Sequence, residues 1–176
     1  MARLSALLAG ERVPARGLEH ILSACRRVTG AEAGTVYVRR GEVLDFEVVQ
    51  NDVLAARMGA GEVLRRLAAR PLSLREPSIA SYVVLTRASV NLRDADEIPA
   101  DLSCTHFRTL DRKIDYRTRS MLATPLRDAQ GRVFGVLQLI NALEGKRVGA
   151  FSKDHQAVVQ TLAALAAQIP TPAGSS

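Results

Sequence analysis

The residues of this chain that can do acid–base, nucleophilic or metal chemistry are few and scattered. Its three histidines lie far apart in the sequence, and Cys25 and Cys104 lack the CxxC spacing of a zinc or redox site. Neighbouring carboxylates occur at residues 94–97, in a polar stretch typical of solvated turns. No GxSxG, HExxH, GxxxxGKS/T or GxGxxG motif is present. Because catalysis requires a constellation of such groups, the sequence predicts a protein that is not an enzyme and has no metal site.

The charge of the chain bears on its partners. It has 24 Lys and Arg against 18 Asp and Glu, giving a net charge of +6, and all but three of the 24 are Arg. Aromatic residues make up 4% with no Trp, so a base-stacking platform is poorly supplied. Solvated arginines are therefore favoured over electrostatic nucleic-acid binding. We expect no nucleic-acid or membrane partner and a cytoplasmic location, since no apolar stretch could span a bilayer and no signal peptide is evident.

The elements that must position any site follow from hydrophobic periodicity. Apolar residues at helical spacing in residues 18–29 predict a helix whose buried stripe includes Cys25 and Val28. Alternation in residues 35–39 and 44–48 predicts two antiparallel strands joined by a short Gly turn. The following elements are a partly helical segment at 54–70, short strands at 72–74 and 90–92, a helix at 78–87 capped by Ser78, and a long polar loop at 94–110.

The last third of the chain predicts a hairpin and a final helix. Two apolar runs flank residues 128–131, where Asp first and Gly fourth suit a type I turn. Ser152 is the expected N-cap of the final helix, whose apolar positions are Val158, Leu162, Leu165 and Ile169. The expected fold is α+β: an antiparallel sheet with the N- and C-terminal helices on one face and ligand-facing loops and short helices on the other. Residues 1–17 would be an extension, 18–169 the domain and 170–176 a polar tail.

Several segments of the sequence resemble the GAF family of small-molecule sensor modules. They are Q-N-D from Gln50, S-I-A-S-Y-V from Ser78, Y-R-T-R-S-M-L from Tyr116, and G-V-L-Q-L-I-N ending at Asn141. The resemblance covers residues 18–169. It is closest to the branch of cyclic-nucleotide phosphodiesterases and of bacterial signalling proteins such as adenylate cyclases and HD-GYP-associated proteins.

The resemblance implies a ligand site between the sheet and a lid of loop and short helix. Ile79 and Ala80 would offer backbone groups at a helix start, and Phe107 would stack on a planar ring. Asp111 and Thr118 would hydrogen-bond to polar edges of the ligand. Alternatively, Phe107 and Ile79 pack in the core, and Asp111 and Thr118 bond within their loop. The sheet floor would supply Thr35, Gln50, Asn51 and Gln138.

Some positions depart from the family pattern. Arg87 and Asp115 stand where the family has Gly, the residue suited to unusual backbone dihedrals. Ser81 replaces another Gly near the expected pocket. Ala142 replaces a Lys and His155 a Glu, which predicts the loss of an ion pair and of the capping box at the last helix.

The resemblance implies a non-enzymatic sensory domain for a small planar ligand, with a cyclic nucleotide as the leading class and no resident cofactor. It also implies a homodimer through the terminal helices. Pro170 and Pro172 end the last helix, and with Met1 they favour a free-standing sensor acting on a signalling protein in trans over a fragment of a longer protein. The alternatives are a dimerisation or protein-docking module with a vestigial pocket, a free methionine sulfoxide reductase, whose cysteines would be unsuitably placed here, and a bilin carrier attached at Cys104.

Overall fold

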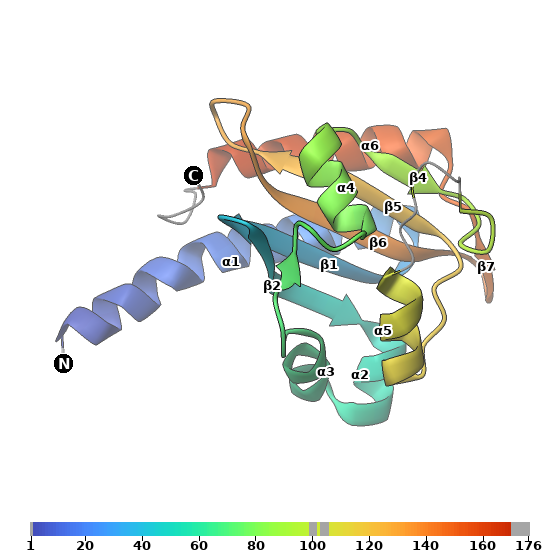
Figure 1. Cartoon of the computed structure of the whole chain (residues 1–176), viewed down its shortest axis with the longest axis horizontal. Coiled ribbons are helices and arrows are strands. Elements are labelled where there is room, and N and C mark those ends of the chain that lie inside the picture. Colours follow the sequence, from blue (N-terminus) through green and yellow to red (C-terminus); the bar gives the residue numbers. More distant parts are fainter. Residues whose placement is uncertain (1, 99–101, 103–105, 170–176) are drawn as a thin grey trace.

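The computed structural model describes residues 2–98, 102 and 106–169, with the side chains of residues 15–98, 102 and 108–169. Its strands are β1 (Ala31–Arg40), β2 (Val43–Asn51), β3 (Leu72–Ser73), β4 (Val90–Leu92), β5 (Met121–Arg127), β6 (Val133–Glu144) and β7 (Arg147–Gly149). They form an antiparallel sheet in the order β3-β2-β1-β6-β5-β4, with β7 paired to β6 (Figure 1). The predicted α+β class is confirmed.

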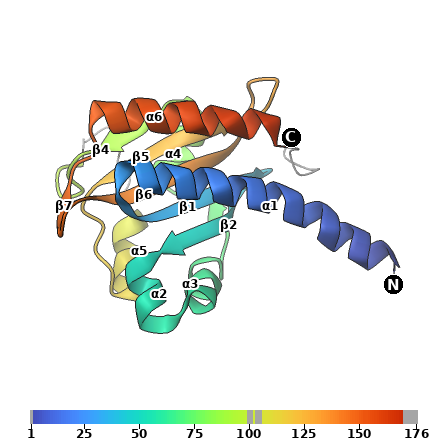
Figure 2. The same cartoon turned by 180° about the vertical axis from the view of Figure 1, so that it is seen from behind.

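Helices α1 (Ala2–Thr29) and α6 (Lys153–Ala164) lie side by side on one face of the sheet, as Figure 2 shows. Gly34 in β1 allows this close packing, because a Cβ there would come within 2.6 Å of Leu22 Cδ1 on α1. Cys25 is fully buried in the same core, where burial raises its thiol pKa to about 12. It is a small apolar core residue, as the sequence predicts.

The apolar stripes predicted for these two helices are partly wrong. Val28 is 50% exposed, Val158 44% and Leu165 46%. The buried residues at the C-terminal end are instead Val159, Ala163 and Ala166, the last in the short 3-10 helix η1 (Leu165–Gln168). Alanines facing the sheet let the helix approach closely, and this turns the larger side chains toward solvent.

The start of α6 corrects a second expectation. Ser152 is the N-cap, and its Oγ accepts a hydrogen bond from His155 N at 3.0 Å. In return His155 Nδ1 accepts from Ser152 N at 3.4 Å. An unprotonated imidazole nitrogen is an acceptor, so the His completes the capping box whose loss was predicted.

The opposite face of the sheet carries the shorter helices α2 (Asp52–Met58), α3 (Ala60–Leu67), α4 (Ile79–Thr86) and α5 (His106–Ile114) (Figure 1). Ser78 caps α4 as predicted. The loop predicted at 94–110 is wrong at its end, because α5 begins at His106. Leu110 and Ile114, one turn apart, pack together against a cluster under α2 and α3, which anchors this otherwise polar helix. Helix α1 runs without a break across the boundary predicted at residue 18.

The predicted β5–β6 hairpin is confirmed, and its turn is closed by Gly131 N donating to Asp128 O at 2.9 Å. Among the residues that the structure describes, three that are not glycine adopt left-handed dihedrals: Arg87 (φ 58°), Asp115 (φ 49°) and Asn141 (φ 57°). Arg87 and Asp115 are two of the three positions where the family pattern has a Gly, whereas the third, Ser81, lies inside α4. The backbone keeps the turn that a Gly would favour, at a cost in strain.

Candidate functional site

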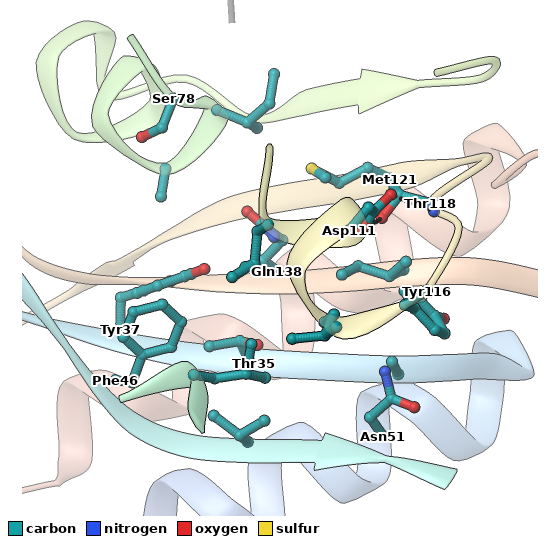
Figure 3. Close-up of a pocket in the computed structure, with 18 of the residues that line it drawn as sticks. Thr35, Tyr37, Phe46, Asn51, Ser78, Asp111, Tyr116, Thr118, Met121 and Gln138 are labelled. Carbon is teal, nitrogen blue, oxygen red and sulfur yellow. Dashed lines mark hydrogen bonds between the residues drawn. The ribbon is translucent and has the colours of Figure 1, made fainter. Parts of the chain in front are cut away.

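A partly open cavity lies between the sheet and the helices α4 and α5 (Figure 3). Two apolar clusters flank it on this face, one under α4 and one under α2, α3 and α5, and Phe46 packs against both. Its volume is about 60 Å³, counted as the space that the centre of a water molecule can occupy. The lining is mainly apolar, with a few polar side chains among residues such as Ala33, Leu72, Ile79, Leu110, Ile114 and Met121.

The floor of the cavity comes from the central strands. Thr35 in β1 and Gln138 in β6 are direct partners across the ladder, so their side chains stand together on one face. Tyr37 follows Thr35 by two residues and therefore shares that face. Figure 3 shows Thr35 and Gln138 in the middle, with Tyr37 and Phe46 at one end and Asn51 at the other. The Tyr37 and Phe46 rings lie 4.8 Å apart between centroids and form an aromatic end wall.

Four polar side chains on this floor are buried and lack a complete set of partners. Exposure is 5% for Tyr37, 6% for Thr35, and 7% for both Asn51 and Gln138. Within the described part of the chain, the two hydroxyls, the Gln138 carboxamide and Asn51 Nδ2 have no hydrogen-bond partner. The polar atoms themselves face accessible space, because among the described residues the buried side-chain atom without a partner is Asn91 Oδ1 and none of these four. The four groups can therefore bond to water or to a ligand in the cavity.

The lid side of the cavity is a hydrogen-bonded unit. Asp111 on α5 accepts from Thr118 N at 2.6 Å and from Thr118 Oγ1 at 3.0 Å. Burial raises the pKa of Asp111, and these two hydrogen bonds from Thr118 oppose the rise. Both side chains keep acceptor capacity, since a carboxylate oxygen or a hydroxyl can accept a further hydrogen bond.

The loop that carries Thr118 is fixed by one buried residue. Asn141, 2% exposed, accepts from Arg119 N at 2.8 Å through Oδ1. Its Nδ2 lies 2.9 Å from Arg117 O and 3.0 Å from the Tyr116 hydroxyl. That hydroxyl also donates to Glu32, and burial together with this carboxylate raises the pKa of Tyr116. The loop beside the cavity is therefore held to strand β6.

The GAF domain model matches residues 14–169 of this sequence. The chain belongs to the GAF family. Its fold is similar to a type II free methionine-R-sulfoxide reductase from Thermoplasma acidophilum, at 18% identity and a TM-score of 0.56, covering 89% of this chain and 94% of that one. It is also similar to a GAF domain/HD domain protein from Geobacter sulfurreducens, at 16% identity and a TM-score of 0.62. That match covers 92% of this chain and 94% of the other. A third similar structure is that of residues 122 to 287 of a methyl-accepting chemotaxis protein, at 16% identity and a TM-score of 0.66. The match covers 89% of this chain and 87% of the other. At these identities the likeness shows the fold alone.

The structure of this GAF domain brings most of the predicted site residues together. The cavity is bordered by Thr35, Gln50, Asn51, Ile79, Ala80, Asp111, Thr118 and Gln138. The side chain of the ninth, Phe107, lies outside the part of the chain whose side chains are described. That these residues bind a ligand stays a prediction.

Two of the predicted roles change. Gln50 does not project from the floor, because its carboxamide accepts from Arg26 Nη1 at 3.1 Å and donates to Ser23 Oγ at 2.9 Å, both on α1. It pairs with Gly34, which faces α1, so the alternation of the strand turns its side chain to that helix. Asn51 Oδ1 accepts from Leu54 N at 2.9 Å and caps α2, which leaves its Nδ2 for the cavity. Asp111 and Thr118 are hydrogen-bonded to each other, which is the alternative that the sequence left open for these two residues.

The sequence reasoning missed Tyr37, Phe46, Ser78 and Tyr116 as lining residues. Tyr37 had a signal, since it alternates with Thr35 along one predicted strand. Phe46 and Tyr116 had none in the local pattern, because their places depend on how β2 and the 116–120 loop fold against α5.

Charge in this GAF domain is distributed unevenly around the site. Of the described residues that line the cavity, none is Lys, Arg or His, and one, Asp111, is acidic. The arginines of the neighbouring loop, Arg117 and Arg119, line two other open hollows. In one of these, Arg117 pairs with Asp96 at 3.1 Å. Within the described ranges, no cluster of three or more His, Cys, Asp or Glu residues forms a metal site. Across those same ranges, no helix has the length and apolarity to cross a membrane.

Proposed function

We propose that this protein is a non-enzymatic sensory GAF domain that binds a small planar molecule in the cavity between the sheet and α4–α5. The single observation that carries the proposal is the set of buried, unpartnered polar groups that face the cavity from Tyr37, Thr35, Gln138 and Asn51. An apolar cavity with a few convergent polar groups is the usual form of a small-molecule site.

Calorimetry on the purified chain tests this proposal. Cyclic AMP and cyclic GMP are the first ligands to titrate, followed by nucleosides and free bases. A double variant, Thr35→Val with Gln138→Leu, removes two of the polar groups while keeping the volume of the floor. Heat of binding that disappears in this variant supports the site. Absence of heat with every ligand at millimolar concentration, in a folded sample, favours the alternative of a docking module with a vestigial pocket.

The proposed absence of enzymatic activity is supported by Cys25, which lies in the core on the α1 side of the sheet rather than at the cavity. Cys104 lies outside the described residues. Because some structural neighbours are free methionine-R-sulfoxide reductases, turnover of methionine sulfoxide in the presence of a thiol reductant is the direct check. Turnover that a Cys104→Ala variant abolishes would replace the sensory proposal by the enzymatic one.

We further propose that the domain forms a homodimer through α1 and α6 and acts on a signalling protein in trans. Exposed apolar side chains on these neighbouring helices support a contact: Val28, Val158 and Leu165. Light scattering at micromolar concentration tests it, with the variant Val158→Glu as the matched perturbation. A monomer mass for the unaltered chain rejects the dimer.

A further inference from the structure

The cavity has room for a small planar ligand. About 60 Å³ is open to the centre of a water-sized probe, and the space that the probe itself sweeps is larger than that. Several waters, or a planar ring system in their place, therefore fit between the sheet and the two helices.

The charges at the cavity limit the ligand. The described lining residues provide no cation, and the one charged side chain is the carboxyl of Asp111. At the start of α4, Ser78 Oγ accepts from Ser81 N, and the N–H groups of Ile79 and Ala80 supply hydrogen-bond donors and a partial positive charge but no full charge. A buried phosphate diester would lose its hydration without an ion-pair partner, which is costly. An uncharged ligand avoids that cost.

The polar groups of the floor indicate which edge of the ligand they contact. The Gln138 carboxamide presents an acceptor oxygen and a donor nitrogen in one plane, and neither has a protein partner within the described residues. This pair matches the neighbouring donor and acceptor of a lactam or an amidine. Thr35 stands beside it across the β1–β6 ladder, and Tyr37 supplies a hydroxyl at the end wall. Burial raises the pKa of Tyr37, which keeps that hydroxyl protonated.

We propose that the cavity binds an uncharged purine base, with the lactam or amidine edge of the base hydrogen-bonded in pairs to Gln138. This proposal rests on the proposed function and narrows it: the ligand is the free base and not the cyclic nucleotide. The amide can rotate by half a turn, so Gln138 meets either the lactam edge of guanine or the amidine edge of adenine. The apolar remainder of the lining then covers the two faces of the ring.

The experiment is a calorimetric titration of the full chain with adenine, guanine, cyclic AMP and cyclic GMP. We expect at least one base to bind at least tenfold more tightly than its own cyclic nucleotide. A cyclic nucleotide that binds as tightly as its base overturns this inference and leaves the sensory function standing. No binding of any of the four overturns this inference, and the sensory function is overturned with it only if the nucleosides also give no heat.

Variants test the role of Gln138. Gln138→Leu keeps the size of the side chain and removes both hydrogen bonds, and we expect it to weaken base binding at least tenfold. Because it replaces an unpartnered buried amide, its thermal unfolding midpoint should not fall. Gln130→Leu, in the exposed turn of the same hairpin, is the matched control and should bind as the unaltered chain does. Unchanged affinity in Gln138→Leu overturns the assignment of the edge.

Discussion

Replacing Asn141 should destabilise the protein and loosen the loop beside the cavity. The side chain makes three hydrogen bonds of 3.0 Å or less to the loop, to Arg119 N, Arg117 O and the Tyr116 hydroxyl. At about 1 kcal/mol each, Asn141→Ala loses about 3 kcal/mol. The variant also places Ala at φ 57°, a left-handed conformation that costs an L-residue roughly 1–2 kcal/mol. Because Asn141 already bears part of this strain, only the difference between Ala and Asn adds to the loss. We expect a total of about 3–4 kcal/mol.

Asn141→Gly separates the two contributions, because it loses the same hydrogen bonds but accepts the left-handed backbone. Asn141→Gly should lower the free energy of unfolding by about 0.5–1 kcal/mol less than Asn141→Ala does. Gly avoids the backbone strain, but it also gives the unfolded chain more conformational freedom, which offsets part of that gain. Urea unfolding followed by circular dichroism measures both values, with unchanged slopes as the check on two-state behaviour. A loss below about 1 kcal/mol for Ala would refute the assignment of Asn141 as the anchor of the loop. A Gly variant no more stable than the Ala variant would refute the contribution of backbone strain.

Three further predictions concern single residues. Arg87→Gly should raise the free energy of unfolding by about 0.5–1 kcal/mol in the same assay, because Arg87 bears a left-handed backbone and an exposed side chain; a loss of stability contradicts this. The raised pKa of Asp111 means that the folded state binds its proton more tightly than the unfolded state does. Stability should therefore fall as the pH rises from the usual value of 3.8 through the raised one, and Asp111→Asn should reduce that fall in a pH series of melts. Cys25, fully buried with a pKa of about 12, should resist iodoacetamide until the protein unfolds, as peptide mass spectrometry can check; rapid labelling of the native chain would be inconsistent with its burial.

Local patterns in the sequence predicted the sheet well. Alternation in β1 and β2, the Asp–Gly turn of the β5–β6 hairpin and the caps Ser78 and Ser152 are short-range signals, and each is confirmed. These signals act within a few residues, so a single sequence carries them fully. The left-handed dihedrals at Arg87 and Asp115 were not predicted, but they fall where the family resemblance places a Gly.

The helices were predicted less well because their orientation depends on packing. In α6 and the η1 turn that follows it, Val158 and Leu165 suggested the buried face, but Val159, Ala163 and Ala166 are the buried residues. Only the closeness of helix and sheet decides which of two plausible faces is buried, and no residue in the helix itself encodes that distance. Helix α5 was missed for a related reason, since Leu110 and Ile114 gain their apolar contacts from α2 and α3, far away in the sequence.

The cavity combines both kinds of information. Thr35, Asn51 and Gln138 could be placed on the floor from strand alternation and family resemblance, whereas Gln50 could not, because its direction is set by Arg26 and Ser23 on α1. What the sequence does not contain is how the two apolar clusters, with Phe46 packed against both, frame a space that leaves these polar groups without protein partners. On the function proposed above, a ligand would complete the hydrogen bonds that the fold alone leaves open. Because water can meet the same groups in the ligand-free protein, the free energy gained on binding would be the difference between the two sets of hydrogen bonds.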